Sequence, residues 1–169
     1  MTSEVRDKRT YTLAEFTRLP DNGKRYELVK GKLVEMAQPG DLHGRVGSKL
    51  LTRLADFVED HKLGLIYIPT GFVLENSNPK RSTVRAPAVA FLQTSRVPAE
   101  ALDGVLPIPP DLALEVVSPS DVWTKVDDKV DEYLHAGVAM VWVVYPRRQV
   151  AFVHQPDQPM LMLLGPRPN

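Results

Sequence analysis

Glu115 is the residue whose position is hardest to explain without chemistry, because it stands in the middle of an apolar segment. Residues 112–117 read Leu-Ala-Leu-Glu-Val-Val, which predicts a strand buried on both faces. A buried carboxylate without a partner costs several kcal/mol or changes its pKa. Glu115 should therefore lie beside a cation, a metal ion or a cleft. A strand end open to solvent and a buried ion pair are the structural alternatives.

Lys129 lies on the apolar side of the helix that is expected after this strand. It stands three residues after Val126 and four before Tyr133, so its Cβ belongs to the apolar stripe of the helix. A lysine at the edge of such a stripe can extend its ammonium group to solvent. If the intervening turn folds the helix back over the strand, Lys129 and Glu115 meet at the carboxyl end of that strand.

Two further residues, Glu27 and His43, could act as acids, bases or metal ligands, but their positions in the sequence favour structural roles. Glu27 alternates with apolar residues in a short predicted strand, a pattern that favours a surface glutamate. His43 stands in the first turn of a long predicted helix, where a packing or helix-end role is the simplest interpretation. The sequence contains neither the G-x-x-x-x-G-K-[ST] phosphate loop nor a G-x-G-x-x-G fingerprint.

The elements that must position these residues follow an α/β pattern. A short helix is expected over residues 12–19, a hairpin over 25–36 around Gly31, and an amphipathic helix from Asp41 to about Lys62. Two apolar strands, at 111–118 and 138–145, are joined by a helix that ends near Ala136, which is typical of a parallel crossover unit. Further strands are expected at 65–69, 71–75, 87–93, 150–154 and 160–164. The pattern predicts a mixed β-sheet flanked by helices.

Composition narrows the class of protein. The length of 169 residues suits one domain, and we expect a flexible charged N-terminus over residues 1–10 and a single domain over 11–169. The absence of cysteine excludes a disulfide scaffold, thiolate zinc and thiol catalysis. With 21 basic and 21 acidic side chains the net charge is zero, so the chain lacks the excess of positive charge that is typical of nucleic-acid-binding domains. The local basic clusters, Lys80-Arg81 with Arg85 and Arg147-Arg148, are interpreted as solvated loops.

The sequence shows no targeting or membrane-spanning segment. The first ten residues contain no apolar stretch of the kind found in secretory signals. The longest apolar run, residues 138–145, is far shorter than a bilayer requires. We therefore expect a cytoplasmic protein with no membrane partner.

Taken together in order, five pieces of the chain resemble a known family. They are RYELVKGKLVEM, His43 at the head of a helix, VRAPAVAFLQ, DLALEVVSPSD and KVDEYLHAGVAMVWVVYP. This set resembles the Uma-type family of restriction endonucleases, a branch of the PD-(D/E)XK nuclease superfamily. The resemblance runs from about Tyr11 to Val153 and is most specific over residues 111–146. It implies a restriction-endonuclease-like core.

The resemblance also implies a site. It assigns catalytic roles to Glu27, His43, Glu115 and Lys129, with Glu115 as the main ligand and Glu27 as a supplementary ligand of Mg²⁺ or Mn²⁺. In many superfamily members a lysine follows the glutamate by two residues. Here Val117 stands at that place, and Lys129 of the next helix takes the role of stabilising charge. The implied substrate is DNA, and a homodimer would suit cleavage of both strands.

One departure from the family pattern bears on activity. The family motif R-x-P-D is represented by Arg85, Ala86, Pro87 and Ala88, so the metal-binding aspartate is missing. Mg²⁺ demands several oxygen ligands in near-octahedral geometry, so this loss should weaken metal binding. Three hypotheses remain: a metal-dependent DNA endonuclease impaired by Ala88, a catalytically inactive nuclease fold that binds nucleic acid or protein, and an unrelated α/β binding protein. Both nuclease hypotheses require Glu27, Glu115 and Lys129 to converge in one cleft.

Overall fold

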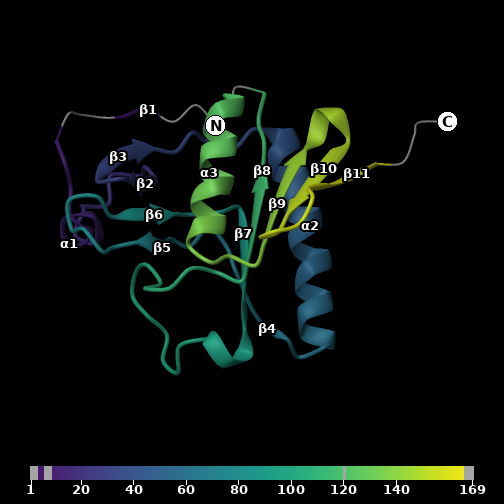
Figure 1. The fold of residues 1–169 in the computed structure, drawn as a ribbon, viewed down its shortest axis with the longest axis horizontal. Helices are drawn as coiled ribbons and strands as arrows, with labels where there is room; N and C mark the ends of the chain where they lie inside the picture. The colour runs from purple at the N-terminus through teal and green to yellow at the C-terminus, as the bar shows by residue number, and fades with distance from the viewer. Residues whose placement is uncertain (1–3, 6–8, 120, 166–169) are drawn as a thin grey trace.

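A computed structural model describes residues 4–5, 9–119 and 121–165, which form two β-sheets and three α-helices (Figure 1). The helices are α1 (Leu13–Thr17), α2 (Asp41–Asp60) and α3 (Trp123–His135), with 3-10 turns η1 (Thr94–Arg96) and η2 (Pro146–Arg148). The strands are β1 (Glu4–Val5), β2 (Tyr26–Val29), β3 (Lys32–Glu35), β4 (Gly64–Tyr67), β5 (Phe72–Glu75), β6 (Thr83–Arg85), β7 (Val89–Gln93), β8 (Leu112–Val116), β9 (Met140–Tyr145), β10 (Val150–His154) and β11 (Leu161–Leu164).

The larger sheet is mixed and has the strand order β11-β10-β9-β8-β7-β4. Its one parallel pair is β8 with β9, in a register that runs from Leu112 opposite Met140 to Val116 opposite Val144. The other neighbouring strands pair antiparallel. The predicted crossover unit of strand, helix and parallel strand is therefore confirmed, with α3 as the connecting helix.

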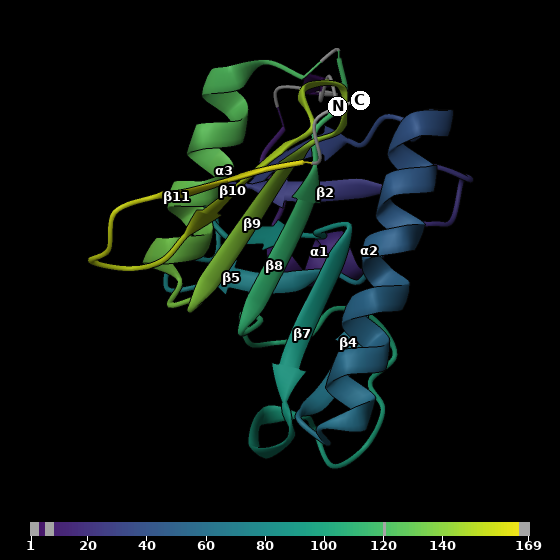
Figure 2. The same cartoon turned by 90° about the vertical axis from the view of Figure 1, so that its right-hand side faces the viewer.

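Helices α2 and α3 cover opposite faces of the six-stranded sheet (Figure 2). Along β8, Leu114 packs on the side of α2 with residues that include Leu50. Ala113 packs on the side of α3 with residues that include Tyr133. Because side chains alternate along a strand, Glu115 shares the face of Ala113 and points toward α3.

The second sheet is antiparallel, in the order β1-β3-β2-β6-β5, and was not anticipated as a separate sheet. Phe72 of β5 packs with Ala90 and Leu92 of β7, so this sheet lies on the same side of the larger sheet as α3. The sequence did not indicate β6, because three residues are too few to show a period of two. Strand β6 is held by its neighbours, β2 and β5, with Val84 opposite both Leu28 and Val73.

Most predicted elements lie where their sequence signals placed them. The Thr12–Glu15 capping box is present, and α2 begins at Asp41 and ends two residues before the expected Lys62. At the N-terminus, Glu4–Val5 pairs with β3, whereas residues 1–3 and 6–8 of the predicted flexible segment lie outside the described residues.

No helix in the described part of the chain combines the length and apolar character needed to cross a membrane.

Gly31 in the β2–β3 hairpin fixes the position of this hairpin against the loop before β6. Its φ is +77°, its N–H donates to the carbonyl of Ser82 at 2.9 Å, and an added Cβ would collide with the backbone carbonyl of Lys80. Gly23 also has a positive φ, of +74°, but a Cβ there would meet nothing within 4 Å.

We therefore expect Gly31→Ala to lower the free energy of unfolding more than Gly23→Ala, which carries only a conformational cost of about 1 kcal/mol. Urea unfolding of both variants measures the difference. Equal losses would show that the hairpin can move away from Lys80 without cost.

Candidate active site

Three charged side chains from different elements meet in one cleft. The Nζ atom of Lys129 in α3 lies 3.0 Å from Oε1 of Glu27 in β2 and 2.8 Å from Oε1 of Glu115 in β8. All three residues line a cleft of about 260 Å³. The helix after β8 folds back over the strand, so the convergence that both nuclease hypotheses require is present.

Glu27 is buried, and the expectation of a surface glutamate was wrong. Its side chain is covered because β2 pairs with β6 in the second sheet while α3 lies near, and the residue is only 4% exposed. Oε2 of Glu27 accepts from Nη1 of Arg85 at 2.7 Å, and Oε1 accepts from the backbone N–H of Ala86 at 2.9 Å. Burial alone would raise the pKa of Glu27, but the charges of Lys129 and Arg85 and these hydrogen bonds lower it to about 2.

Arg85 is a buried bridge between two carboxylates rather than part of a solvated basic loop, as the sequence had suggested. Its Nη1 contacts Glu27, and its Nε lies 2.7 Å from Oε2 of Glu132 on α3. Burial opposes the charged guanidinium, yet the two carboxylates raise the pKa of Arg85 above its usual value. The arginine thus ties the second sheet to α3 directly beside the cleft.

Glu115 is held from two directions by α3. Its Oε1 accepts a hydrogen bond from the Tyr133 hydroxyl at 2.8 Å, in addition to the contact with Lys129. Burial and the nearby Glu115 charge raise the pKa of Tyr133 well above its usual value, so this hydroxyl remains a donor. Burial alone would lower the pKa of Lys129, but the charges of Glu115 and Glu27 raise it, so the amine stays protonated.

Sequence reasoning missed three members of this network: Arg85, Glu132 and Tyr133. Tyr133 was recognised as a member of the apolar stripe of α3, four residues after Lys129, but its hydroxyl was given no role. Glu132 stands three residues after Lys129, a spacing that brings side chains to neighbouring positions on a helix. That spacing was the available signal, whereas nothing local to Arg85 showed that it would be buried.

Ala88 stands at the edge of the cluster and supplies no ligand. Val89 pairs with Leu114, so the preceding residue on this strand is level with Glu115. Ala88 contacts the apolar cluster formed by β7 and β8. The position where the family motif has an aspartate is therefore next to Glu115 along the sheet, but it carries only a methyl group.

The donor set does not complete a Mg²⁺ site. The carboxylates of Glu27 and Glu115 already contact Lys129, and Glu27 also contacts Arg85 and an amide N–H. Among the described residues, no group of three or more His, Cys, Asp or Glu side chains is arranged to hold a metal ion. A Mg²⁺ ion that used both carboxylates would compete with Lys129 and Arg85 for their oxygens.

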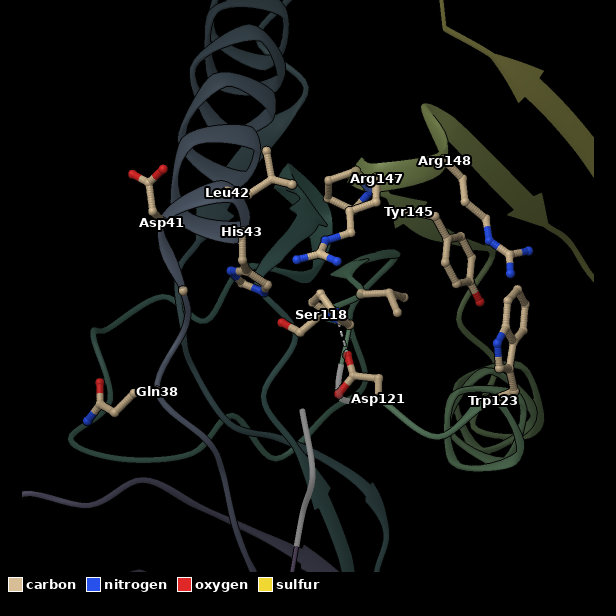
Figure 3. Close-up of a pocket in the computed structure, with 14 residues that line it drawn as sticks. Gln38, Asp41, Leu42, His43, Ser118, Asp121, Trp123, Tyr145, Arg147 and Arg148 are labelled. Carbon is tan, nitrogen blue, oxygen red and sulfur yellow. Dashed lines mark hydrogen bonds between the residues drawn. The ribbon is translucent and has the colours of Figure 1, made fainter.

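His43 is separate from the cluster and lines a second cleft of about 530 Å³ (Figure 3). Desolvation by burial lowers its pKa, against an opposing hydrogen bond with the backbone of Val116. Its Nε2 atom is buried and has no hydrogen-bond partner among the described residues. The two clefts are adjacent, because Val117 and Asp121 line both. His43 therefore stands beside the Glu115 site but does not belong to it.

The chain thus combines a mixed α/β fold with a cluster of glutamates around a lysine. A crystal structure described as a putative nuclease belonging to DUF820, from Anabaena variabilis, matches with a TM-score of 0.79 and 24% sequence identity. The match covers 93% of this chain and 89% of that chain, and at this identity it shows a shared fold. Residues 13–167 match the Uma2 family, whose description is "Putative restriction endonuclease". The chain belongs to this family. Among curated proteins none matches the sequence significantly.

Proposed function

We propose that this protein acts on DNA phosphodiesters through the Glu27–Glu115–Lys129 cluster, and that its metal-dependent endonuclease activity is impaired by Ala88. The convergence of two carboxylates, Glu27 and Glu115, within 3.0 Å of the Lys129 ammonium group carries the proposal. Membership of a nuclease family supports a nucleic-acid substrate. The missing carboxylate next to Glu115 supports the impairment.

In this proposal Lys129 is the residue that stabilises charge on the phosphate. An ammonium group beside a phosphoryl oxygen stabilises the negative charge that develops there during hydrolysis. Glu27 and Glu115 keep Lys129 protonated and fix its position, and Tyr133 orients Glu115 from the other side. Arg85 holds Glu27 in place through its own contact with the carboxylate. The cluster holds three carboxylates and two cations, so a phosphate would reach Lys129 by replacing one of its two carboxylate partners.

A second candidate function is a nuclease fold that binds nucleic acid without cutting it. The observation in its favour is that every charged side chain of the cluster is already in an ion pair. Three carboxylates share two cations: Glu27, Glu115 and Glu132 pair with Arg85 and Lys129. A metal ion would have to displace Lys129 from both of its partners. On this alternative, DNA contacts remain but hydrolysis does not occur.

Ala88→Asp should increase affinity for Mg²⁺ or Mn²⁺ at least about tenfold, because it adds a hard oxygen ligand level with Glu115. Isothermal titration calorimetry of the wild type and the variant with each metal measures this change. Ala88→Asn is the matched control, since it has the same shape without the charge and should gain little. Adding Glu115→Gln to Ala88→Asp should abolish the gain.

Cleavage of plasmid DNA by the same proteins separates the two candidate functions. Slow metal-dependent cutting by the wild type and faster cutting by Ala88→Asp would support an impaired endonuclease. Metal binding by Ala88→Asp without any cutting by the wild type would favour the binding module. If the wild type binds Mg²⁺ as tightly as Ala88→Asp, the proposed impairment is wrong. Thermal unfolding of each variant checks that the fold is intact.

A further inference from the structure

The cleft that contains His43 lies where two parallel strands end. Strands β8 and β9 run parallel, and their carboxyl ends lead into Val117 and Tyr145, both of which line this cleft. Ligands in α/β proteins commonly bind at the carboxyl ends of parallel strands. The volume of about 530 Å³ falls in the range of small-ligand sites. The cleft adjoins the Glu115 site but shares none of its charged cluster.

One side of this cleft favours a negatively charged group. Arg147 and Arg148 of η2 line it, and within the described ranges neither makes an ion pair with a carboxylate. Helix α2 starts here at Gly40 without a side-chain cap, so its first N–H groups and the positive end of its dipole face the same region. The buried Nε2 of His43 is a further polar atom that has no hydrogen-bond partner among the described residues.

The two acidic residues that line the cleft are already engaged. Asp41 lies 3.7 Å from Arg45 on the exposed side of α2. Asp121 accepts from the backbone N–H of Ser118 at 2.7 Å, the hydrogen bond drawn in Figure 3. These contacts fix the positions of the two carboxylates.

The other side of the cleft is aromatic. The rings of Trp123 and Tyr145 stack with centroids 4.8 Å apart and planes at 16°, and Cζ of Arg148 lies 4.8 Å from the centre of the Trp123 ring (Figure 3). Trp123 is nevertheless 46% exposed, which is unusual for a large indole already in a stack. Unpaired nucleobases stack on such aromatic rings and on arginine planes.

We propose that this cleft binds one unpaired nucleotide of a single-stranded segment of the nucleic acid whose phosphodiester lies at Lys129. Its phosphate contacts Arg147 and the N-terminus of α2, and its base stacks on the ladder of Arg148, Trp123 and Tyr145. This inference rests on the proposed function and names the form of its substrate. A paired base in a duplex is already stacked and cannot enter, and the zero net charge of the chain gives little general attraction to a duplex. The Arg147-Arg148 pair then belongs to a binding site, not to a solvated loop.

Fluorescence anisotropy with a labelled single-stranded oligothymidylate, in EDTA, tests this proposal. We expect tighter binding of the single strand than of a duplex of equal length, and at least about a tenfold loss with Arg147→Ala/Arg148→Ala. Trp123→Leu should cost about tenfold for the single strand, whereas Trp123→Phe keeps an aromatic face and retains most of the affinity. Lys80→Ala/Arg81→Ala is the matched control, because it removes two exposed positive charges from a loop that does not line the cleft.

Three results would overturn the inference in distinguishable ways. Equal losses in Arg147→Ala/Arg148→Ala and in the loop control would show that only overall charge matters. Binding that is unaffected by the cleft variants but weakened by Lys129→Met would remove the nucleotide site and leave the proposed function standing. No binding of either oligonucleotide by the wild type in EDTA would remove the nucleotide site, and no binding with Mn²⁺ present would remove the proposed function as well.

Discussion

Arg85→Met should lower the free energy of unfolding by about 3–5 kcal/mol, which is the usual cost of breaking a buried ion pair by removing one partner. Arg85 contacts Glu27 and Glu132 at 2.7 Å each, and its side chain is almost completely buried. Without it, the Glu27 carboxylate loses its Nη1 donor while remaining only 4% exposed. Urea unfolding at pH 7, followed by circular dichroism, measures the change.

Two variants give this prediction its controls. Arg81→Met removes an exposed arginine from the loop before β6 and should change stability by less than about 0.5 kcal/mol. Combining Glu27→Gln with Arg85→Met should lower the free energy of unfolding by less than the sum of the two single changes. The double variant does not leave an unpaired Glu27 charge in the interior. A loss below about 1 kcal/mol in Arg85→Met would mean that water or Lys129 compensates the carboxylate.

The stability of the wild type should fall as the pH is lowered from about 5 toward 2, in part through Glu27. The pKa of this carboxyl is about 2 in the folded protein, below its ordinary value of 4.5, because Lys129, Arg85 and the Ala86 N–H outweigh the effect of burial. A depressed pKa stabilises the folded state above the unfolded pKa, and this contribution is lost as the pH falls through the folded pKa. Its size is on the order of 3 kcal/mol.

Comparison with Glu27→Gln isolates this contribution from that of the other carboxyl groups. The variant should be less stable than the wild type at pH 7, since two cations lose a partner, and the difference should shrink as the pH approaches 2. Glu59→Gln, on the exposed side of α2, should keep the wild-type dependence. Denaturant unfolding at several pH values between 2 and 7 provides the data. A difference between wild type and Glu27→Gln that stays constant over this range would contradict the prediction.

The same contacts connect stability with the candidate site. Glu27 and Arg85 are among the few charged residues buried in the described part of the chain, and both lie at the junction of the second sheet with α3. Substitutions there will change folding as well as any reaction. Ala88 is uncharged and lies outside these ion pairs, so it is the better position at which to test catalysis.

The sequence by itself determined the crossover unit and two candidate site residues within it, Glu115 and Lys129. The apolar run of β8 has one interruption, Glu115, and the amphipathic period of α3 places Lys129 on its inner face. These signals are local, because strand alternation and helical period are properties of neighbouring residues. The ordered set of motifs likewise indicated the family that residues 13–167 match.

Only the tertiary structure decided which charges are buried. Glu27 and Arg85 look like surface residues in a short hairpin and a polar loop, and they become interior because β2 and β6 pair across more than fifty residues beneath α3. The same packing separates His43 from the glutamates and brings Trp123, Tyr145 and Arg148 into one stack beside it. Burial of a charge depends on the segments that cover it, and these are distant in the sequence, so no local pattern records it.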